Sequence, residues 1–384
     1  MTTAVIVDAI RTPSGRGKPG GQLSGYHPVD LLAGVLEALV DRSGLDPAQV
    51  DDVIAGCLSQ VGTQSVNIAR NAVLAAGFPE SVPATTVDRQ CGSSQQAATF
   101  AAQGVMAGAY DIVIACGVEQ MSSHPINVAT LGEDYLGPRV HARYPDGLVG
   151  QGVSAELIAA KWGLTREQLD DYAARSHRLA ASADFSRELV PTDGHTADET
   201  VRPATTAESL AALKPAFYDD GIARRFPQIE WRVTAGNSSP LTDGASAALI
   251  MSEERALQLG LTPRARFHSF AVVGSDPLEM LMGVVPATRK VLDRAGLGVD
   301  DIDTFEVNEA FASVPLAWQA ELRADPERVN PRGGAIALGH ALGSSGTRLL
   351  GTMLTTLEQT GGRYGLQVMC EGGGMANATI IERL

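Results

Sequence analysis

Apolar residues recur along the chain in two ways, as short continuous runs and as runs with helical periodicity. Residues 4–7 and 53–57 are short apolar runs that predict buried strands. Residues 29–41 have the period of an amphipathic helix, and Gly44 marks its end. Residues 97–109 are almost all small or apolar and predict a second helix. This alternation predicts an α/β fold with buried parallel or mixed sheets covered by helices.

The same pattern occurs twice, at an offset of about 252 residues. Each copy contains a helix end, a D-R-x-G-L turn, an acidic linker and a strand, and later a small-residue corner and another strand. Three matches in the same order predict a duplicated α/β unit. The matched segments are 41–52 with 293–303, 91–94 with 342–345, and 111–116 with 366–370.

The segment between the two copies has few strand signals. Thr165 and Gln168 have the spacing of a capping box, which predicts a helix that extends to about residue 183. A helix over 154–162 precedes it, and an apolar strand over 247–251 follows the segment. We therefore expect a largely helical insertion, too long to be a simple loop.

Composition narrows the possible classes of function. The 384 residues are 44% hydrophobic and 19% charged, which is typical of a globular core. The net charge of −14 argues against a nucleic-acid partner. No apolar run is long enough for a membrane span, and no signal peptide is apparent, so we expect a cytoplasmic protein. The four cysteines lie far apart with no C-x-x-C pair, so neither a disulfide framework nor a metal site is indicated.

Basic residues are concentrated in the insertion, between Arg202 and Arg232. In an acidic chain, such a concentration is what an anionic ligand would need. A solvated face is the alternative interpretation of these side chains.

Cys91 has the clearest chemical setting. It follows a short β-type run and a polar corner, and it precedes a helix. Unpaired N–H groups at a helix N-terminus favour negative charge, so this position predicts a lowered pKa and a thiolate nucleophile. A structural cysteine at a tight turn is the alternative.

Three further corners in the second copy carry polar residues. Asn308 ends a strand, His340 lies in a glycine-rich loop that opens a helix, and Cys370 precedes three glycines. Separately, these could be a helix cap, a structural histidine and a core cysteine. If the repeat makes the corners face each other across a pseudo-twofold axis, all three meet Cys91. Gly15 to Gly20 fit G-x-G-x-x-G, but no helix follows directly, so we set a dinucleotide site aside.

Together these motifs resemble the thiolase family along nearly the whole chain. The segments that carry the resemblance include 11–13, 117–122, 234–239, 243–245, 286–289, 308–311, 339–340 and 370–374. The resemblance implies the thiolase fold: duplicated βαβαβαββ halves in five αβαβα layers with a helical loop domain. The implied domains are residues 1–119 with 242–264, the loop domain 120–241, and residues 265–384.

The resemblance also implies a role for each corner. Cys91 would be the nucleophile that holds the acyl group, and His340 would take its proton. Cys370 would be the general base at the α-carbon or, in the degradative direction, the donor to the leaving enolate. One oxyanion hole would combine His340 with a water held by Asn308, and the other the N–H groups of Cys91 and Gly372. The implied function is cleavage of 3-oxoacyl-CoA to acetyl-CoA and a shortened acyl-CoA.

Coenzyme A would be a substrate, and no other cofactor is implied. Arg202 and Ser209 match nucleotide contacts of the family, and Ser269 matches its pantetheine contact. A homodimer or homotetramer is implied, with a strand edge near 84–91 at the dimer interface.

The chain departs from the family pattern at three places. Ala341 replaces a proline, Ser94 replaces a glycine, and Gly150-Gln151-Gly152 replaces the His-Met-Gly of the acetoacetyl-CoA-forming branch. The last change argues against a pocket tuned for short acyl chains. Residues 308–318 and 370–384 resemble thiolases that act on long or bulky acyl chains, including steroid side chains. Acetoacetyl-CoA formation, a decarboxylating condensing enzyme and a non-catalytic lipid-binding protein are the alternatives, and Cys370 argues against the condensing enzyme.

Overall fold

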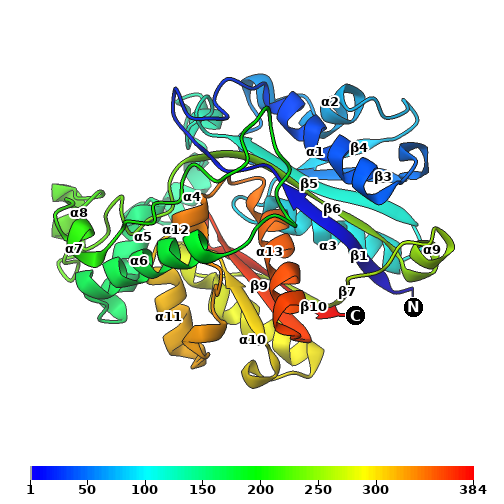
Figure 1. Ribbon diagram of the computed structural model, residues 1–384. Coiled ribbons are helices and arrows are strands. Elements are labelled where there is room, and N and C mark those ends of the chain that lie inside the picture. The colour runs from blue at the N-terminus through cyan, green and yellow to red at the C-terminus, as the bar shows by residue number, and fades with distance from the viewer. Residues whose placement is uncertain (1) are drawn as a thin grey trace.

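The protein is built from two halves that share one strand order (Figure 1). The computed structural model describes residues 2–384. Its strands are β1 (Ala4–Arg11), β2 (Gly15–Arg16), β3 (Asp52–Gly56), β4 (Ala84–Val87), β5 (Ile112–Gln120), β6 (Thr242–Ser252), β7 (Ala265–Gly274), β8 (Thr304–Val307), β9 (Tyr364–Glu371) and β10 (Met375–Arg383).

Helices connect most of these strands, as the predicted α/β pattern requires. They are α1 (Pro28–Ser43), α2 (Ile68–Ala75), α3 (Ser93–Met106), α4 (Gly137–Arg143), α5 (Gln151–Lys161), α6 (Arg166–Ser182), α7 (Ala207–Ala211), α8 (Asp220–Arg225), α9 (Glu253–Gln258), α10 (Val284–Ala295), α11 (Ser313–Leu322), α12 (Ala335–Leu338) and α13 (Ser345–Thr360).

The strand order is β4-β3-β5-β6-β1 in the first half and β8-β9-β10-β7 in the second. In each half the strands after the first helix pair in parallel, β3 with β4 and β5, and β8 with β9. The last strand is antiparallel in both halves, β6 beside β5 and β10 beside β9. β1 and β7 pair over two residues, which joins the two halves into one continuous path of strands.

The halves differ at one edge. The first half ends in β4, whereas the second half has only a single bridge between Phe305 and Val329 at the corresponding place. The two halves therefore have the same order of strands, except that the counterpart of β4 in the second half is only this single bridge.

Two long helices lie between the halves. α3 and α13 pack against each other, and each also contacts strands of both halves. α1 and α2 cover the outer face of the first half, and α10 and α11 that of the second (Figure 1). The layers are thus helix, sheet, helix, sheet, helix, and the predicted five-layer arrangement is confirmed.

Local signals in the sequence correspond to the observed boundaries. α1 and α10 both end at a left-handed glycine, Gly44 at φ 64° and Gly296 at φ 66°, so the two D-R-x-G-L turns are equivalent. Thr165 and Gln168 form the expected capping box at the start of α6. Gly15 and Arg16 form β2 and pair with β6, so no helix N-terminus follows the G-x-G-x-x-G spacing.

The helices α4 to α8 all lie between β5 and β6 in sequence and form the green group at the left of Figure 1. Leu210 at α7 and Phe311 before α11 belong to the same hydrophobic cluster, so this group packs against the second half. Among residues 2–384, no helix has the length and hydropathy needed to cross a bilayer.

Candidate functional site

Cys91 lies in a tight turn between β4 and α3. The Asp88 carboxylate accepts the backbone N–H of Gln90 at 2.6 Å, and the Ser93 hydroxyl accepts that of Arg89 at 2.9 Å. Gln90 has φ 48°, a left-handed conformation that costs a non-glycine residue free energy. Side-chain hydrogen bonds thus hold a strained residue directly before the candidate nucleophile.

The environment of Cys91 is more apolar than its position in the sequence suggests. The side chain is 2% exposed and packs with Met121, Leu342, Leu349 and Met369. Burial raises the pKa of the Cys91 thiol well above its ordinary value, and negative charge on Cys370 or Glu371 would raise it further. The predicted lowering of this pKa is therefore wrong for the resting protein, because desolvation outweighs the helix N-terminus. Cys91 needs a base to become a thiolate.

His340 has the protonation state of such a base. It is 4% exposed, and burial lowers the pKa of its imidazole to about 3, so the ring is neutral. The Ser345 hydroxyl donates to the Ala341 carbonyl at 2.8 Å, so the hydrogen bond of 2.6 Å between Ser345 and His340 Nδ1 takes its proton from the ring. Nε2 is then the unprotonated nitrogen, 3.3 Å from Asn308 Nδ2.

The loop that carries His340 is tied to the first half. The His340 N–H donates to the Thr242 hydroxyl at 2.9 Å, and the Gly343 N–H donates to Glu119 Oε2 at 2.9 Å. Glu119 also accepts from the N–H groups of Leu58 and Ser59 and from the side chain of Gln64. A Cβ at Gly343 would lie 2.5 Å from the Val118 carbonyl oxygen, so only glycine permits this approach.

Asn308 directly follows β8, beside the strand that carries Cys370. Its N–H donates to the Val368 carbonyl at 3.1 Å, and its side chain is 1% exposed. The next residue, Glu309, accepts from Tyr172, Ser176, Asn330 and the Ile336 N–H. Glu309 thereby links α6 of the insertion to the loop that leads to His340.

Cys370 is the second last residue of β9, is fully buried, and has a pKa that burial raises to about 12. The corner after it meets the Cys91 turn, because a Cβ at Gly372 would lie 2.9 Å from Gln90 Oε1. Gly373 is exposed, so the site reaches the surface here. The structure thus brings Cys91, Asn308, His340 and Cys370, predicted from separate corners, to one place between the halves.

The predicted coenzyme A contacts are not all at this place. Arg202 and Ser209 are exposed on the segment 202–209 of the insertion, and Ser209 is part of the capping box of α7. Ser269 lies elsewhere: it is in β7, and its hydroxyl donates to the Val291 carbonyl in the outer helix α10 at 3.3 Å. Ser269 is buried and its hydroxyl is already paired with α10, so these contacts do not support a pantetheine contact there, and its assignment stays a prediction.

Other residues near the site were not predicted individually. Ser239 donates to the Ala310 carbonyl at 3.1 Å, two residues after Asn308, and is half-buried. Glu119 and Glu309 are buried carboxylates that fix the loops around the cysteines. All three lie inside segments that carry the family resemblance, which was the available signal.

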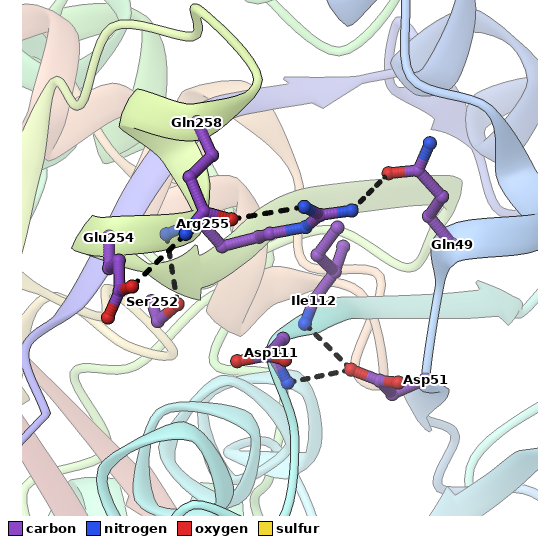
Figure 2. Close-up of a pocket in the computed structure, with 8 residues that line it drawn as sticks. All are labelled: Gln49, Asp51, Asp111, Ile112, Ser252, Glu254, Arg255 and Gln258. Atoms are coloured by element: carbon purple, nitrogen blue, oxygen red, sulfur yellow. Dashed lines mark hydrogen bonds between the residues drawn. The ribbon is translucent and has the colours of Figure 1, made fainter.

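A separate pocket of about 300 Å³ lies at the N-terminal ends of β3 and β5, away from the end of the sheet where Cys91 lies (Figure 2). Most of its polar side chains are already paired. Asp51 accepts the N–H groups of Asp111 and Ile112 at 2.6 and 2.9 Å, and Arg255 donates to Gln49 and Gln258 at 2.8 and 3.1 Å. This pocket contains none of the predicted catalytic residues.

The candidate site thus consists of the Cys91 turn in one half, Cys370 near the end of β9 in the other half, and a neutral histidine whose loop packs against Cys91 through Leu342. The family model for the thiolase N-terminal domain matches residues 4–254, and that for the thiolase C-terminal domain matches residues 261–383. The chain belongs to the thiolase family, and the prediction of an acyltransferase of this family is confirmed.

Individual relatives cover the full chain. It is 49% identical over 400 residues to the steroid 3-ketoacyl-CoA thiolase FadA6 of Mycobacterium tuberculosis, covering 100% of this chain and 95% of that protein. It is 44% identical over 401 residues to the 3-ketoacyl-CoA thiolase of Serratia proteamaculans, with 100% of both covered. The crystal structure of the Bacillus anthracis acetyl-CoA acetyltransferase has a TM-score of 0.89 at 38% identity, covering 100% of this chain and 99% of that one.

Proposed function

We propose that this thiolase cleaves 3-oxoacyl-CoA to acetyl-CoA and a shortened acyl-CoA. The observation that carries the proposal is the neutral His340, whose Nε2 faces Asn308 and whose loop packs against Cys91 through Leu342. The full-length relatives named 3-ketoacyl-CoA thiolase support the same activity.

In the proposed first half-reaction, Cys91 attacks the 3-oxo carbon and its thiol proton passes to His340 Nε2. The bond between C2 and C3 then breaks, the acyl group stays on Cys91, and Cys370 donates its proton to the leaving acetyl-CoA enolate. The raised pKa of Cys370, about 12, keeps that proton available.

In the second half-reaction, CoA enters as the acceptor thiol. Its proton restores Cys370, its sulfur attacks the Cys91 thioester, and the imidazolium proton of His340 restores Cys91. Each group returns to its starting protonation state. The protonated Nε2 of His340 with a water on Asn308 would stabilise one oxyanion, and the N–H groups of Cys91 and Gly372 the other.

For coenzyme A we propose Arg202 and Ser209 at the nucleotide end. Both are exposed on the segment that leads into α7, and Leu210 of α7 lies against Gly236. From Gly236 the chain runs directly to Ser239 and so to the Asn308 corner. Ser239 is therefore a better candidate than Ser269 for a hydroxyl along the pantetheine arm.

For the acyl group we propose long or bulky chains, including steroid side chains. The relative at 49% identity is named a steroid 3-ketoacyl-CoA thiolase. At the place of the His-Met-Gly of the acetoacetyl-CoA-forming branch, Gly152 lies directly against Phe217. A Cβ at position 152 would be 2.3 Å from the Phe217 ring, so this part of the insertion is packed differently from that branch. Acetoacetyl-CoA formation is the second candidate, supported by the acetyl-CoA acetyltransferase structure at TM-score 0.89.

Thiolysis of a panel of 3-oxoacyl-CoAs tests these proposals. The panel should run from acetoacetyl-CoA to long-chain and steroid-derived thioesters, with release of acetyl-CoA as the readout. We expect kcat/KM to be highest for bulky substrates. A maximum at acetoacetyl-CoA would favour the second candidate, and no turnover with any substrate would contradict both and favour a lipid-binding protein.

We also propose a cytoplasmic homodimer or homotetramer that needs no cofactor beyond its CoA substrates. β4 is a sheet edge with half-exposed side chains, and the helices beside it expose Leu74 and Phe100. Light scattering at micromolar concentration should give at least twice the mass of the chain, whereas a monomer mass would contradict the proposal. Dialysis against a chelator should leave thiolysis unchanged.

A further inference from the structure

Glu371, the last residue of β9, lies at the Cys91 turn and has no part in the thiolase mechanism described above. The side chain is fully buried, and neither carboxyl oxygen has a hydrogen-bond partner within residues 2–384. A Cβ at Gly92 would lie 2.2 Å from Glu371 Oε1, so the carboxyl group occupies the space beside the residue after Cys91.

Asn377 of β10 completes this arrangement. Its Nδ2 donates to the Gly92 carbonyl at 3.0 Å, while its buried Oδ1 has no partner in the described chain. Both Asn377 Oδ1 and Glu371 Oε1 lie within 3 Å of the position that a Gly92 Cβ would occupy. A carboxylic acid can donate its O–H to an amide oxygen, whereas a carboxylate and an amide oxygen are both acceptors. A proton on Glu371 would therefore supply a donor at a place where both oxygens lack one.

The charged groups around Glu371 do not offset the negative charge that an ionised Glu371 would carry. The turn before α3 contributes Arg89 and Asp88, which have opposite effects on Glu371, and no ion pair joins Arg89 to Glu371 in the described chain. β9 contributes Cys370, and Cys91 lies next to Gly92. α13 contributes Arg348, which faces Glu306 and Glu188 instead.

Further from Glu371, Glu119 faces Cys91 from β5. α10 packs on the opposite face of β9. Burial raises the pKa of Glu371 to about 8, in agreement with the missing partners.

We propose that Glu371 is a positioning residue that acts as a neutral carboxylic acid at the Cys91 turn, and that its ionisation opposes thiolate formation on Cys91 and Cys370. The neutral acid holds the turn through Asn377. When it loses its proton to solvent, a negative charge lies beside both sulfurs and disfavours a second one. The inference rests on the proposed function for the roles of the two cysteines.

The test measures the alkylation rate of Cys91 by iodoacetamide against pH, by mass spectrometry of the Cys91 peptide, in the full-length enzyme and in Glu371→Gln. At pH 6.5 the side chain at position 371 is neutral in both proteins, so we expect equal rates. At pH 9 we expect Glu371→Gln to react about tenfold faster, since a nearby like charge shifts a pKa by about one unit. The pH profile of kcat/KM for thiolysis should fall above pH 8 only in the wild type.

Glu306→Gln is the matched control. Glu306 is another buried glutamate with a pKa near 8 and an unpartnered Oε1, but its charged neighbours are Arg348, Glu309, Glu188 and Arg332. In Glu306→Gln, Cys91 should be alkylated at the wild-type rate at both pH values. The same ratio of Glu371→Gln to wild type at pH 6.5 and pH 9 would overturn the proposal.

Should Glu371→Gln fail to fold, Glu371→Met supplies a second neutral side chain of similar length, with the same expected rates. Alkylation does not depend on turnover. A protein that fails in thiolysis but shows the pH-dependent difference would contradict the proposed function and leave the inference about Glu371 intact.

Discussion

The two halves of the molecule place a glutamate at equivalent positions and use it differently. Glu119 near the end of β5 and Glu371 at the end of β9 are related by the repeat, as are Gly343 and Gly92, which they approach. Glu119 accepts four hydrogen bonds, including the Gly343 N–H, whereas Glu371 accepts none within residues 2–384.

The neighbouring strands repeat the same relation. In the first half, the Ser246 hydroxyl of β6 donates to the Ser344 carbonyl at 2.7 Å. In the second half, Asn377 of β10 donates to the Gly92 carbonyl at 3.0 Å. Each half thus holds the start of the other half's central helix. The difference shows that duplication preserved the scaffold, while one junction became a structural clamp and the other the setting of Cys91.

The largest expected effect is at Cys91, whose counterpart in the second half is Leu342. Cys91→Ala removes the only thiol of the pair, so kcat for thiolysis should fall by at least about 10⁴-fold. Cys116→Ala, a buried thiol of the same half whose surroundings are apolar, should keep kcat within about twofold. Substantial turnover in Cys91→Ala would show that the two junctions do not differ in the proposed way.

The next largest effect is expected at His340. His340→Ala should lower kcat by about 10²- to 10⁴-fold, because Cys91 would lose its base. The pKa of His340, about 3, lies below its ordinary value, so the ring stays neutral as pH rises from 5 to 8. The pH profile of kcat should therefore show no histidine titration in this range, and a bell with its acid limb near pH 6.5 would contradict this assignment.

The clamp at Glu119 should matter more for stability than for chemistry. Glu119→Ala leaves several buried N–H groups without an acceptor, so the free energy of unfolding should fall by about 3 kcal/mol in urea denaturation. Glu371→Gln should change it by less than about 1 kcal/mol at pH 5, where the unfolded carboxyl group is still partly protonated. Equal losses in the two variants would remove the distinction between the junctions.

Ser345 and Ser94 provide a smaller contrast at equivalent positions. Ser345 accepts from His340 Nδ1, whereas Ser94 accepts the Thr347 N–H at 3.1 Å. Ser345→Ala should lower kcat about tenfold, because the histidine tautomer loses its partner. Ser94→Ala should lower only stability, by about 1 kcal/mol. Steady-state kinetics and thermal unfolding of both variants make the comparison.

The last prediction concerns how stability depends on pH. The pKa of Glu371 is raised in the folded protein to about 8 from 4.5, so the folded state binds more protons between these values. Its contribution to stability is complete below pH 4.5 and is lost as pH rises through 8. The stability of Glu371→Gln relative to wild type should therefore rise by about 1.4 kcal/mol per pH unit between these pKa values, a gain of several kcal/mol in the free energy of unfolding from pH 5 to pH 8.5.

Much of this fold follows from local patterns. The two D-R-x-G-L turns and the Thr165 capping box predict helix ends, and the common offset predicts the duplication, because these signals depend on neighbouring residues. The reduction of one strand to the Phe305–Val329 bridge has no such signal, since strand pairing depends on distant partners.

The candidate site also has features that the sequence shows and features that depend on distant contacts. The corners with Cys91, Asn308, His340 and Cys370 are visible in the sequence, and the duplication brings them together. The raised pKa of Cys91 and the unpaired Glu371 depend on burial between the halves, which no local pattern reports. The burial of Ser269 against α10 is likewise not visible in the sequence, because a match of residue type does not show which way a strand turns its side chain.

The most direct measurement is the location of the covalent acyl group. The enzyme would be incubated with acetyl-CoA, digested with a protease, and its peptides analysed by mass spectrometry. We expect one acetyl group on Cys91, retained in Cys370→Ala and absent in Cys91→Ala. An acetyl group on Cys370 or Cys57, or none on any cysteine of active enzyme, would contradict Cys91 as the acyl carrier at the junction of the two halves.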